Sequence, residues 1–133
     1  MRFENFSFGS IEIDGITCDY DVVIDCGKIR ERKKARSKKF RDEFGHTPLS
    51  IEEDIPWKCR RLVIGTGMYG RLPVMKEVKR EAEHRNIELI IVPTSMAIEV
   101  LEEDDKVTNA ILHDGRACNA SDQSARGAEV AIN

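Results

Sequence analysis

Three closely spaced glycines, at positions 65, 67 and 70, form the stretch of sequence whose residue types point most directly to chemistry. They follow an apolar segment at 62–64, which predicts a β-strand, and precede a helical pattern that opens at Pro73. Glycine allows positive φ angles and close approach of another group, and backbone N–H groups at the start of a helix bind anions. The ligand-binding candidates are therefore the residues of this loop: Gly65, Thr66, Gly67, Tyr69, Gly70 and Arg71.

The segment 65–70 also fits the pattern Gly-x-Gly-x-x-Gly, which between a strand and a helix is typical of dinucleotide-binding loops. Two features weaken that interpretation. The next predicted strand ends in Val92-Pro93-Thr94, without the acidic residue that binds a ribose 2′-hydroxyl, and Pro73 delays the helix. A crevice for a small anionic ligand and a tight structural turn are the alternatives, and no cofactor is predicted.

A block of positive charge lies at 28–41, with nine Lys and Arg residues and a single acid, Glu31, in a chain of net charge −3. Such a block suits a polyanion or a protein partner, and a solvated loop that neutralises an acidic body is the alternative. No aromatic residue precedes Phe40 within the block, so a stacking platform for single strands is absent, and nucleic acid is not the partner we expect. The partner-binding candidates are Arg32, Lys33, Lys34 and Lys38.

No catalytic constellation is evident. The cysteines, Cys18, Cys26, Cys59 and Cys118, are scattered without the spacing of a zinc site, and no Gly-x-Ser-x-Gly elbow occurs. Acidic residues crowd one region at Asp19, Asp21 and Asp25, and we interpret them as solvated acids at a strand edge. We therefore predict neither catalytic residues nor a metal.

The elements that must position these residues begin with an N-terminal β-hairpin. Apolar residues alternate within 6–13, Asp14-Gly15 is a strong hairpin turn signal, and Ile16 starts the return strand. A more buried strand is predicted over 21–25. The basic block that follows is expected to be a loop or irregular ribbon.

A short helix is predicted after this block, because Ser50 and Glu53 have the spacing of a capping box and Pro56 cannot continue a helix. Beyond the glycine loop, the nearly all-apolar run 87–92 reads as a strand buried on both faces, hence parallel and central. Thr94 or Ser95 is predicted to cap the helix that follows.

A last strand is predicted over 107–113, which completes an alternation of strands and helices typical of an α/β domain. We expect one domain over 1–113. Residues 114–133 are small, polar and aperiodic, which favours a disordered C-terminal tail. The N-terminus lacks the apolar core of a secretory signal and no run is long enough to span a bilayer, so we expect a cytoplasmic protein without a membrane contact.

Several short motifs occur in an order that resembles a known family. They are Ser7-Phe8-Gly9-Ser10, Ile13-Asp14-Gly15, Asp21-Val22-Val23-Ile24, Ser37-Lys38, Ile64-Gly65-Thr66-Gly67, Pro93-Thr94 and Ile111-Leu112-His113. Over residues 6–113 the chain resembles a small conserved domain of unknown function whose relatives include a human adipogenesis-associated domain protein and a mitochondrial complex I assembly factor. The resemblance implies a three-layer α/β fold with a mixed central sheet, an N-terminal β-hairpin and an antiparallel last strand.

The resemblance implies no established reaction. Members of the family typically carry a Thr-Cys pair shortly after the histidine, whereas this chain continues with Asp114-Gly115-Arg116, so no role of that cysteine transfers here. We expect a non-enzymatic binding or assembly module acting on a protein partner. The alternative is an enzyme or sensor that binds a small anionic or nucleotide-like ligand at Gly65–Gly70, and the sequence leaves enzymatic activity and oligomeric state open.

Overall fold

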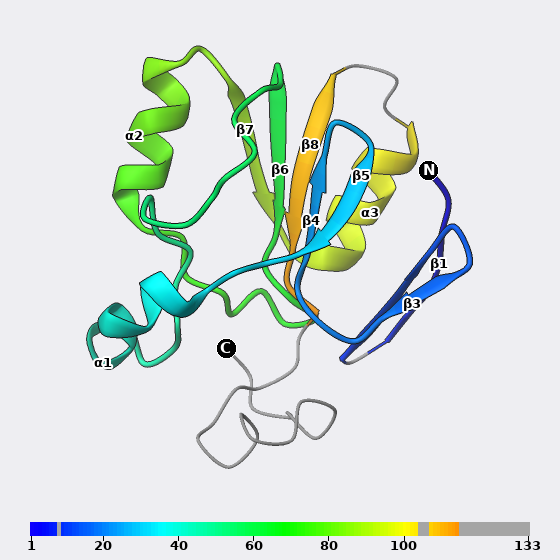
Figure 1. Cartoon of the computed structure of the whole chain (residues 1–133), viewed down its shortest axis with the longest axis horizontal. Helices are drawn as coiled ribbons and strands as arrows, with labels where there is room; N and C mark the ends of the chain where they lie inside the picture. The colour runs from blue at the N-terminus through cyan, green and yellow to red at the C-terminus, as the bar shows by residue number, and fades with distance from the viewer. Residues whose placement is uncertain (8, 104–106, 115–133) are drawn as a thin grey trace.

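The computed structural model describes residues 1–7, 9–103 and 107–114, which form two β-sheets and a few short helices (Figure 1). The strands are β1 (Phe3–Ser7), β2 (Ser10–Ile13), β3 (Ile16–Cys18), β4 (Val22–Asp25), β5 (Lys28–Glu31), β6 (Arg61–Gly65), β7 (Glu88–Val92) and β8 (Thr108–Leu112). The helices are the 3₁₀ helix η1 (Ala35–Phe40), α1 (Arg41–Phe44), α2 (Lys76–His84) and α3 (Thr94–Glu103). The predicted 114–133 tail lies outside the described residues except for Asp114.

Strands β1, β2 and β3 form an antiparallel sheet of their own. The predicted hairpin turn is confirmed, because Asp14 and Gly15 both have positive φ, at 50° and 82°, as a two-residue type I′ turn requires. Strand β1 carries a register irregularity between Glu4 and Ser7.

The larger sheet is mixed, with the order β5-β4-β8-β6-β7. The last strand, β8, runs antiparallel to β4 on one side and parallel to β6 on the other. Within the described residues β7 pairs only with β6, in parallel, so the prediction that 87–92 is a central strand is wrong. The burial of β7 is also only partial: Leu89 packs toward the core on one face of the sheet and Ile90 and Val92 on the other, all three half-buried, while Ile91 is exposed.

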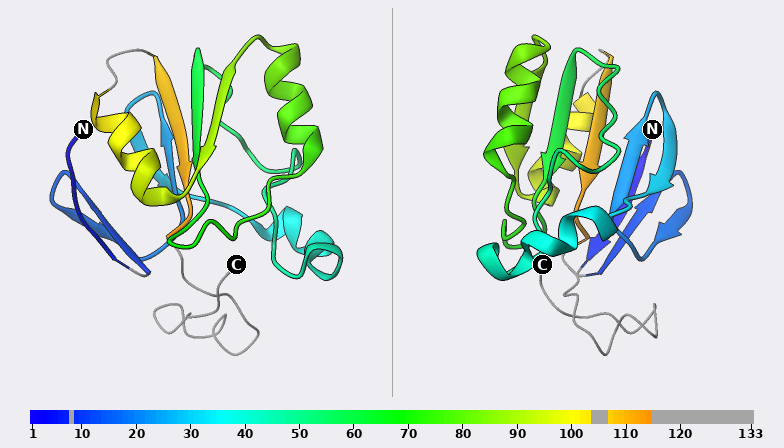
Figure 2. Two further views of the ribbon diagram at one scale, coloured as in Figure 1. Left: turned by 180° about the vertical axis from the view of Figure 1, so that it is seen from behind. Right: turned by 60° about the vertical axis from the view of Figure 1, so that its left-hand side comes forward.

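Three layers result, as Figure 2 shows from two sides. Side chains alternate along the central strands, so that Val63 and Leu112 join one core with α3 and the small sheet, while Leu62, Ile64 and Ile111 join a second core with α2. The fold is thus a single α/β arrangement around a mixed sheet, as expected.

Three local predictions need correction. Helix α2 begins at Lys76 rather than at Pro73, because the chain ahead of it is extended and Val74 forms a parallel bridge with Leu49. The capping-box residues at 50–53 form a turn rather than a helix. The basic block is not irregular throughout, since it contains β5, η1 and the start of α1. Among the described residues, no helix is both long and apolar enough to cross a membrane.

Candidate functional site

Three amide groups of the glycine loop donate hydrogen bonds within the protein. The amide of Thr66 donates to the carbonyl oxygen of Val92 at 2.8 Å, and the amide of Gly67 donates to Oγ1 of Thr94 at 2.8 Å. The amide of Gly70 donates to the carbonyl oxygen of Gly67 at 3.3 Å. These donors would have to be released before they could bind an anion.

The glycine at position 65 serves close packing. A Cβ there would lie 2.9 Å from Oγ1 of Thr94 and 3.0 Å from Cδ2 of Leu112. The same Thr94 hydroxyl donates to the carbonyl oxygen of His113 at 2.7 Å, so one side chain joins the loop, α3 and the end of β8. The loop therefore closes the carboxyl end of the parallel strands.

Of the ligand-binding candidates, Gly65, Thr66 and Gly67 are buried, while Tyr69, Gly70 and Arg71 are exposed. The guanidinium of Arg71 lies 5.5 Å from the ring centroid of Tyr69. Any ligand at this loop would thus meet the exposed part, whereas the three buried members face the protein interior.

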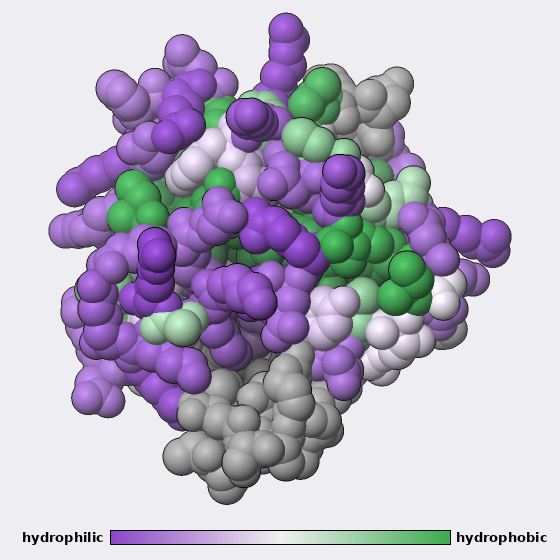
Figure 3. Space-filling view, viewed as in Figure 1, coloured by the Kyte–Doolittle hydropathy of each residue, from purple (hydrophilic) through white to green (hydrophobic). Residues whose placement is uncertain are grey.

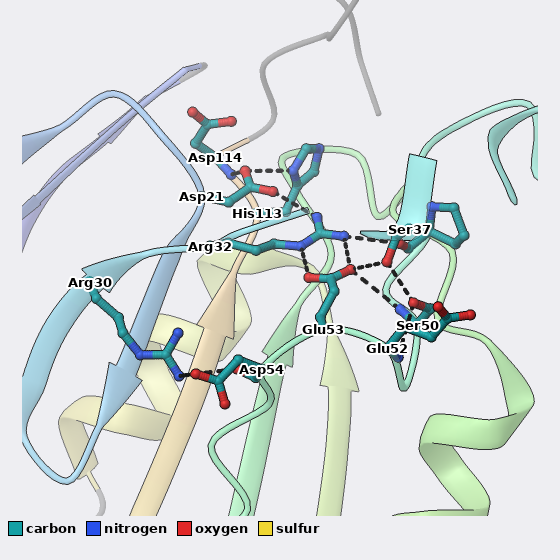
Figure 4. A network of polar contacts seen from close by, with 11 residues as sticks. Asp21, Arg30, Arg32, Ser37, Ser50, Glu52, Glu53, Asp54, His113 and Asp114 are labelled. Atoms are coloured by element: carbon teal, nitrogen blue, oxygen red, sulfur yellow. Dashed lines mark hydrogen bonds and ion pairs between the residues drawn. The ribbon is translucent and has the colours of Figure 1, made fainter. Parts of the chain in front are cut away.

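A buried ion-pair network is the most concentrated polar feature of the described residues (Figure 4). Arg32 is only 4% exposed and lies between two carboxylates. Its Nη1 donates to Oδ2 of Asp21 at 2.9 Å, while Nε and Nη2 donate to the two oxygens of Glu53 at 2.7 and 2.8 Å. The fork geometry uses the planar guanidinium in a way that Lys could not reproduce.

The network continues at both ends. At the Glu53 end, Oγ of Ser37 donates to Oε2 of Glu53 at 2.5 Å and lies 2.6 Å from Oγ of Ser50. At the Asp21 end, Oδ1 of that residue lies 2.8 Å from Nδ1 of His113 and accepts from the amide of Asp114 at 3.0 Å. The network therefore joins β4, the basic block, the 50–53 turn and the end of β8.

Electrostatics within the network favour the charged forms. Burial opposes ionisation of Asp21, but the charge and hydrogen bond of His113, with the charges of Lys34 and Arg32, hold the pKa of Asp21 well below its usual value. Burial likewise opposes the charge of Arg32, and the hydrogen bonds and charges of Glu53 and Asp21 raise the pKa of Arg32. Each buried charge of the network thus faces an opposite charge within the protein.

Asp21, His113 and Asp114 are close enough to share a cation, since one ligand atom from each lies within 4.8 Å of the others. Arg32 already holds the second oxygen of Asp21, so this carboxylate is balanced within the protein. We assign the cluster a structural role: it ties β4 to the end of β8.

A surface groove lies between the basic block, the 50–54 turn and α2. Three hollows of about 170, 510 and 760 Å³ share one lining residue, Ile51, which is 42% exposed. Phe40 and Met75 also line the smallest hollow. In Figure 3 the side of the molecule over α1 and α2 is mostly hydrophilic, with small hydrophobic areas between the polar side chains. We call the combined feature the Ile51 groove.

The structure separates the partner-binding candidates. Arg32 is buried in the ion-pair network, whereas Lys33 and Lys38 are exposed and Lys34 is half-buried. Of these, Lys33 lines the largest hollow of the Ile51 groove, together with Arg36. Sequence reasoning missed Ile51, and the only signal was an apolar side chain next to two acids in a predicted helix that does not form.

Comparison with solved structures identifies relatives. The conserved hypothetical protein PH1505 from Pyrococcus horikoshii OT3 is 32% identical, with a TM-score of 0.68 over 85% of this chain and 98% of that one. The protein MT938 is 22% identical, with a TM-score of 0.61 over 84% and 95% of the two chains. A Bordetella pertussis protein described as a Mth938-like domain is 14% identical, with a TM-score of 0.55 over 84% of each chain.

No protein-family model matches the chain, and no curated protein matches it by sequence. The structural matches support the expected small conserved domain of unknown function, but not the human and mitochondrial relatives that the resemblance named. The identity and coverage shared with PH1505 are high enough to show common descent, and the more distant matches show the fold. The chain therefore belongs to the family of the conserved hypothetical protein PH1505 from Pyrococcus horikoshii OT3 and has a Mth938-like fold.

Proposed function

We propose that this protein is a non-enzymatic binding module that recognises a segment of a partner protein in the Ile51 groove. The observation that carries the proposal is the meeting of three hollows at one exposed apolar side chain, Ile51, on an otherwise charged surface. A large apolar side chain in a concave place surrounded by polar groups is the usual anatomy of a binding hot spot. An assembly role, which the sequence analysis also expected, is a specific form of this function.

The polar chemistry of the described residues favours binding over catalysis. The buried acids Asp21 and Glu53 are held by Arg32, and the loop amides at 66, 67 and 70 have partners within the chain. A catalytic acid or base must instead face a substrate in an accessible cleft. In contrast, the groove is open to a partner, and Glu53 of the ion-pair network lines its largest hollow.

A displayed library of random twelve-residue peptides, panned on the full chain, tests the proposal. We expect enrichment of peptides that bind the wild type and fail to bind Ile51→Asp. The matched control is Met96→Asp, because Met96 is also exposed, at 51%, but lies on α3. Failure to enrich any peptide, or equal loss of binding in the two variants, would overturn the proposal.

A further inference from the structure

The two ends of the Ile51 groove differ in the sign of the charged side chains that have no ion-pair partner. Three acids line its largest hollow: Glu52 pairs with Lys39 at 2.6 Å, Glu53 belongs to the buried network, and Asp54 lies 3.6 Å from Arg30, which also pairs with Asp25 at 3.6 Å. Lys33 and Arg36 line the same hollow, and neither forms an ion pair with another described residue. This end of the groove therefore presents two cations, Lys33 and Arg36, without an ion-pair partner among the described residues.

The opposite end, along α2, is acidic. Its hollow is lined by Glu77, Glu81 and Glu83, with Arg80 as the one residue of permanent positive charge. Glu81 is engaged by Arg85 at 2.6 Å, whereas Glu77 and Glu83 form no ion pair within the described part of the chain. The α2 end thus presents uncompensated negative charge.

Among the residues that line the groove, Glu77 indicates most directly which chemical group a ligand would provide. It lines both the 170 and the 510 Å³ hollows, and its Oε1 is buried without a hydrogen-bond partner among the described residues. A carboxylate oxygen that is removed from water and left without a donor is unfavourable, and a donor supplied by a ligand relieves that cost. A positively charged donor suits it best.

These observations identify the chemistry of the occupant. We propose that the Ile51 groove binds an extended segment of another protein that has acidic residues at one end, an apolar residue in the middle and a Lys or Arg at the other end. The acids meet Lys33 and Arg36, the apolar side chain packs on Ile51 beside Phe40 and Met75, and the basic side chain donates to Glu77. This inference rests on the proposed function and adds the pattern of the partner and its direction in the groove.

The peptides enriched on the full chain test the pattern. We expect most of them to place an acid and a Lys or Arg on opposite sides of an apolar residue. For a peptide of this kind, Glu77→Gln should weaken the Kd about tenfold, the range expected for loss of one charge-assisted hydrogen bond. The matched control Glu99→Gln changes an exposed glutamate of α3 and should leave the Kd unchanged.

The basic end is tested by a swap. Lys33→Glu with Arg36→Glu should abolish binding of the selected peptides and allow binding of peptides whose acids are replaced by lysines. The matched control reverses Lys58 and Arg60, two exposed basic residues next to β6 that do not line the groove, and should leave binding unchanged.

The outcomes separate the two proposals. Peptides that require Ile51 but show no charge pattern, or that bind Glu77→Gln as tightly as wild type, would overturn the inferred pattern and leave the binding function standing. Self-association of the chain that Ile51→Asp abolishes, measured by sedimentation, would show that a second copy occupies the groove and overturn the inference. Absence of any Ile51-dependent peptide would overturn both.

Discussion

The role of Arg32 in the structure differs from the partner-binding role that the sequence suggests. In the sequence it is one of nine basic residues in a short block, whereas in the structure its side chain is 1% exposed and joins Asp21 to Glu53. Burying an ion pair is costly, so the value of the pair lies mainly in avoiding an uncompensated charge. Removing the guanidinium should therefore be far more damaging than removing a surface charge.

We predict that Arg32→Met lowers the free energy of unfolding by about 3–5 kcal/mol, because Asp21 and Glu53 would remain buried without their partner. The measurement is urea unfolding at neutral pH. The control Arg2→Met breaks an exposed pair with Glu4, and it should cost no more than about 1 kcal/mol. Similar losses in the two variants would contradict the structural role of the network.

The lowered pKa of Asp21 predicts an acid-sensitive contribution to stability. Because the folded-state pKa lies below the unfolded value, this contribution is fully present above the usual pKa of 3.8 and is lost as the pH falls through the lowered one. Unfolding free energies measured between pH 7 and pH 2 should fall in that acidic window. Asp21→Asn should flatten the fall, whereas Asp42→Asn, at an exposed position, should not.

At the scale of elements, the junction of β6, α3 and β8 depends on the absence of a side chain at position 65. We predict that Gly65→Ala destabilises the protein by about 1–3 kcal/mol, because its Cβ would press on Thr94 and Leu112. The contrast is Gly70→Asn: this glycine has φ of 68° and only ordinary van der Waals contacts around its Cβ position, and Asn tolerates that conformation at a cost of less than about 1 kcal/mol. Thermal unfolding of both variants shows whether each position requires glycine for close packing or for its backbone conformation.

Elements with a local signal could be predicted from the sequence. The Asp14-Gly15 turn follows from residues adjacent in the chain, and α3 starts at Thr94, within one or two residues of the start that the predicted caps imply. The position of β7 at the sheet edge could not be predicted, because an apolar run reports burial of its two faces and not how many strands pair with it. The late start of α2 depends on a bridge between Val74 and Leu49, which are distant in sequence.

The buried ion-pair network and the partners of the glycine loop could not be predicted either, because the residues that meet there are distant in sequence. The polar network brings together Asp21, Arg32, Glu53 and His113, and the two ends of that set are separated by 92 positions. The loop at 65–70 was placed correctly after a strand, but its amide partners at Val92 and Thr94 come from the next strand and helix. The spacing of residues within one segment cannot predict hydrogen bonds to residues in distant segments.

For the whole molecule, the alternative function predicts binding of a small anion at the exposed part of the glycine loop. A ligand present at a hundred times its Kd stabilises a protein by about 2.7 kcal/mol, which a thermal-shift assay detects. Because the amides of Thr66, Gly67 and Gly70 have partners, we expect no stabilisation by inorganic phosphate or nucleotides. A shift that Arg71→Ala abolishes would instead support an anion site beside Tyr69.

The location of partner binding is the most direct question for the molecule as a whole. Amide chemical shifts of the full chain, recorded as a selected peptide is added, report which surface responds. We predict changes concentrated in residues 33–41, the 50–54 turn and α2, all of which border the Ile51 groove. Changes centred on residues 65–71 or on α3, with the groove unaffected, would contradict the proposed binding surface.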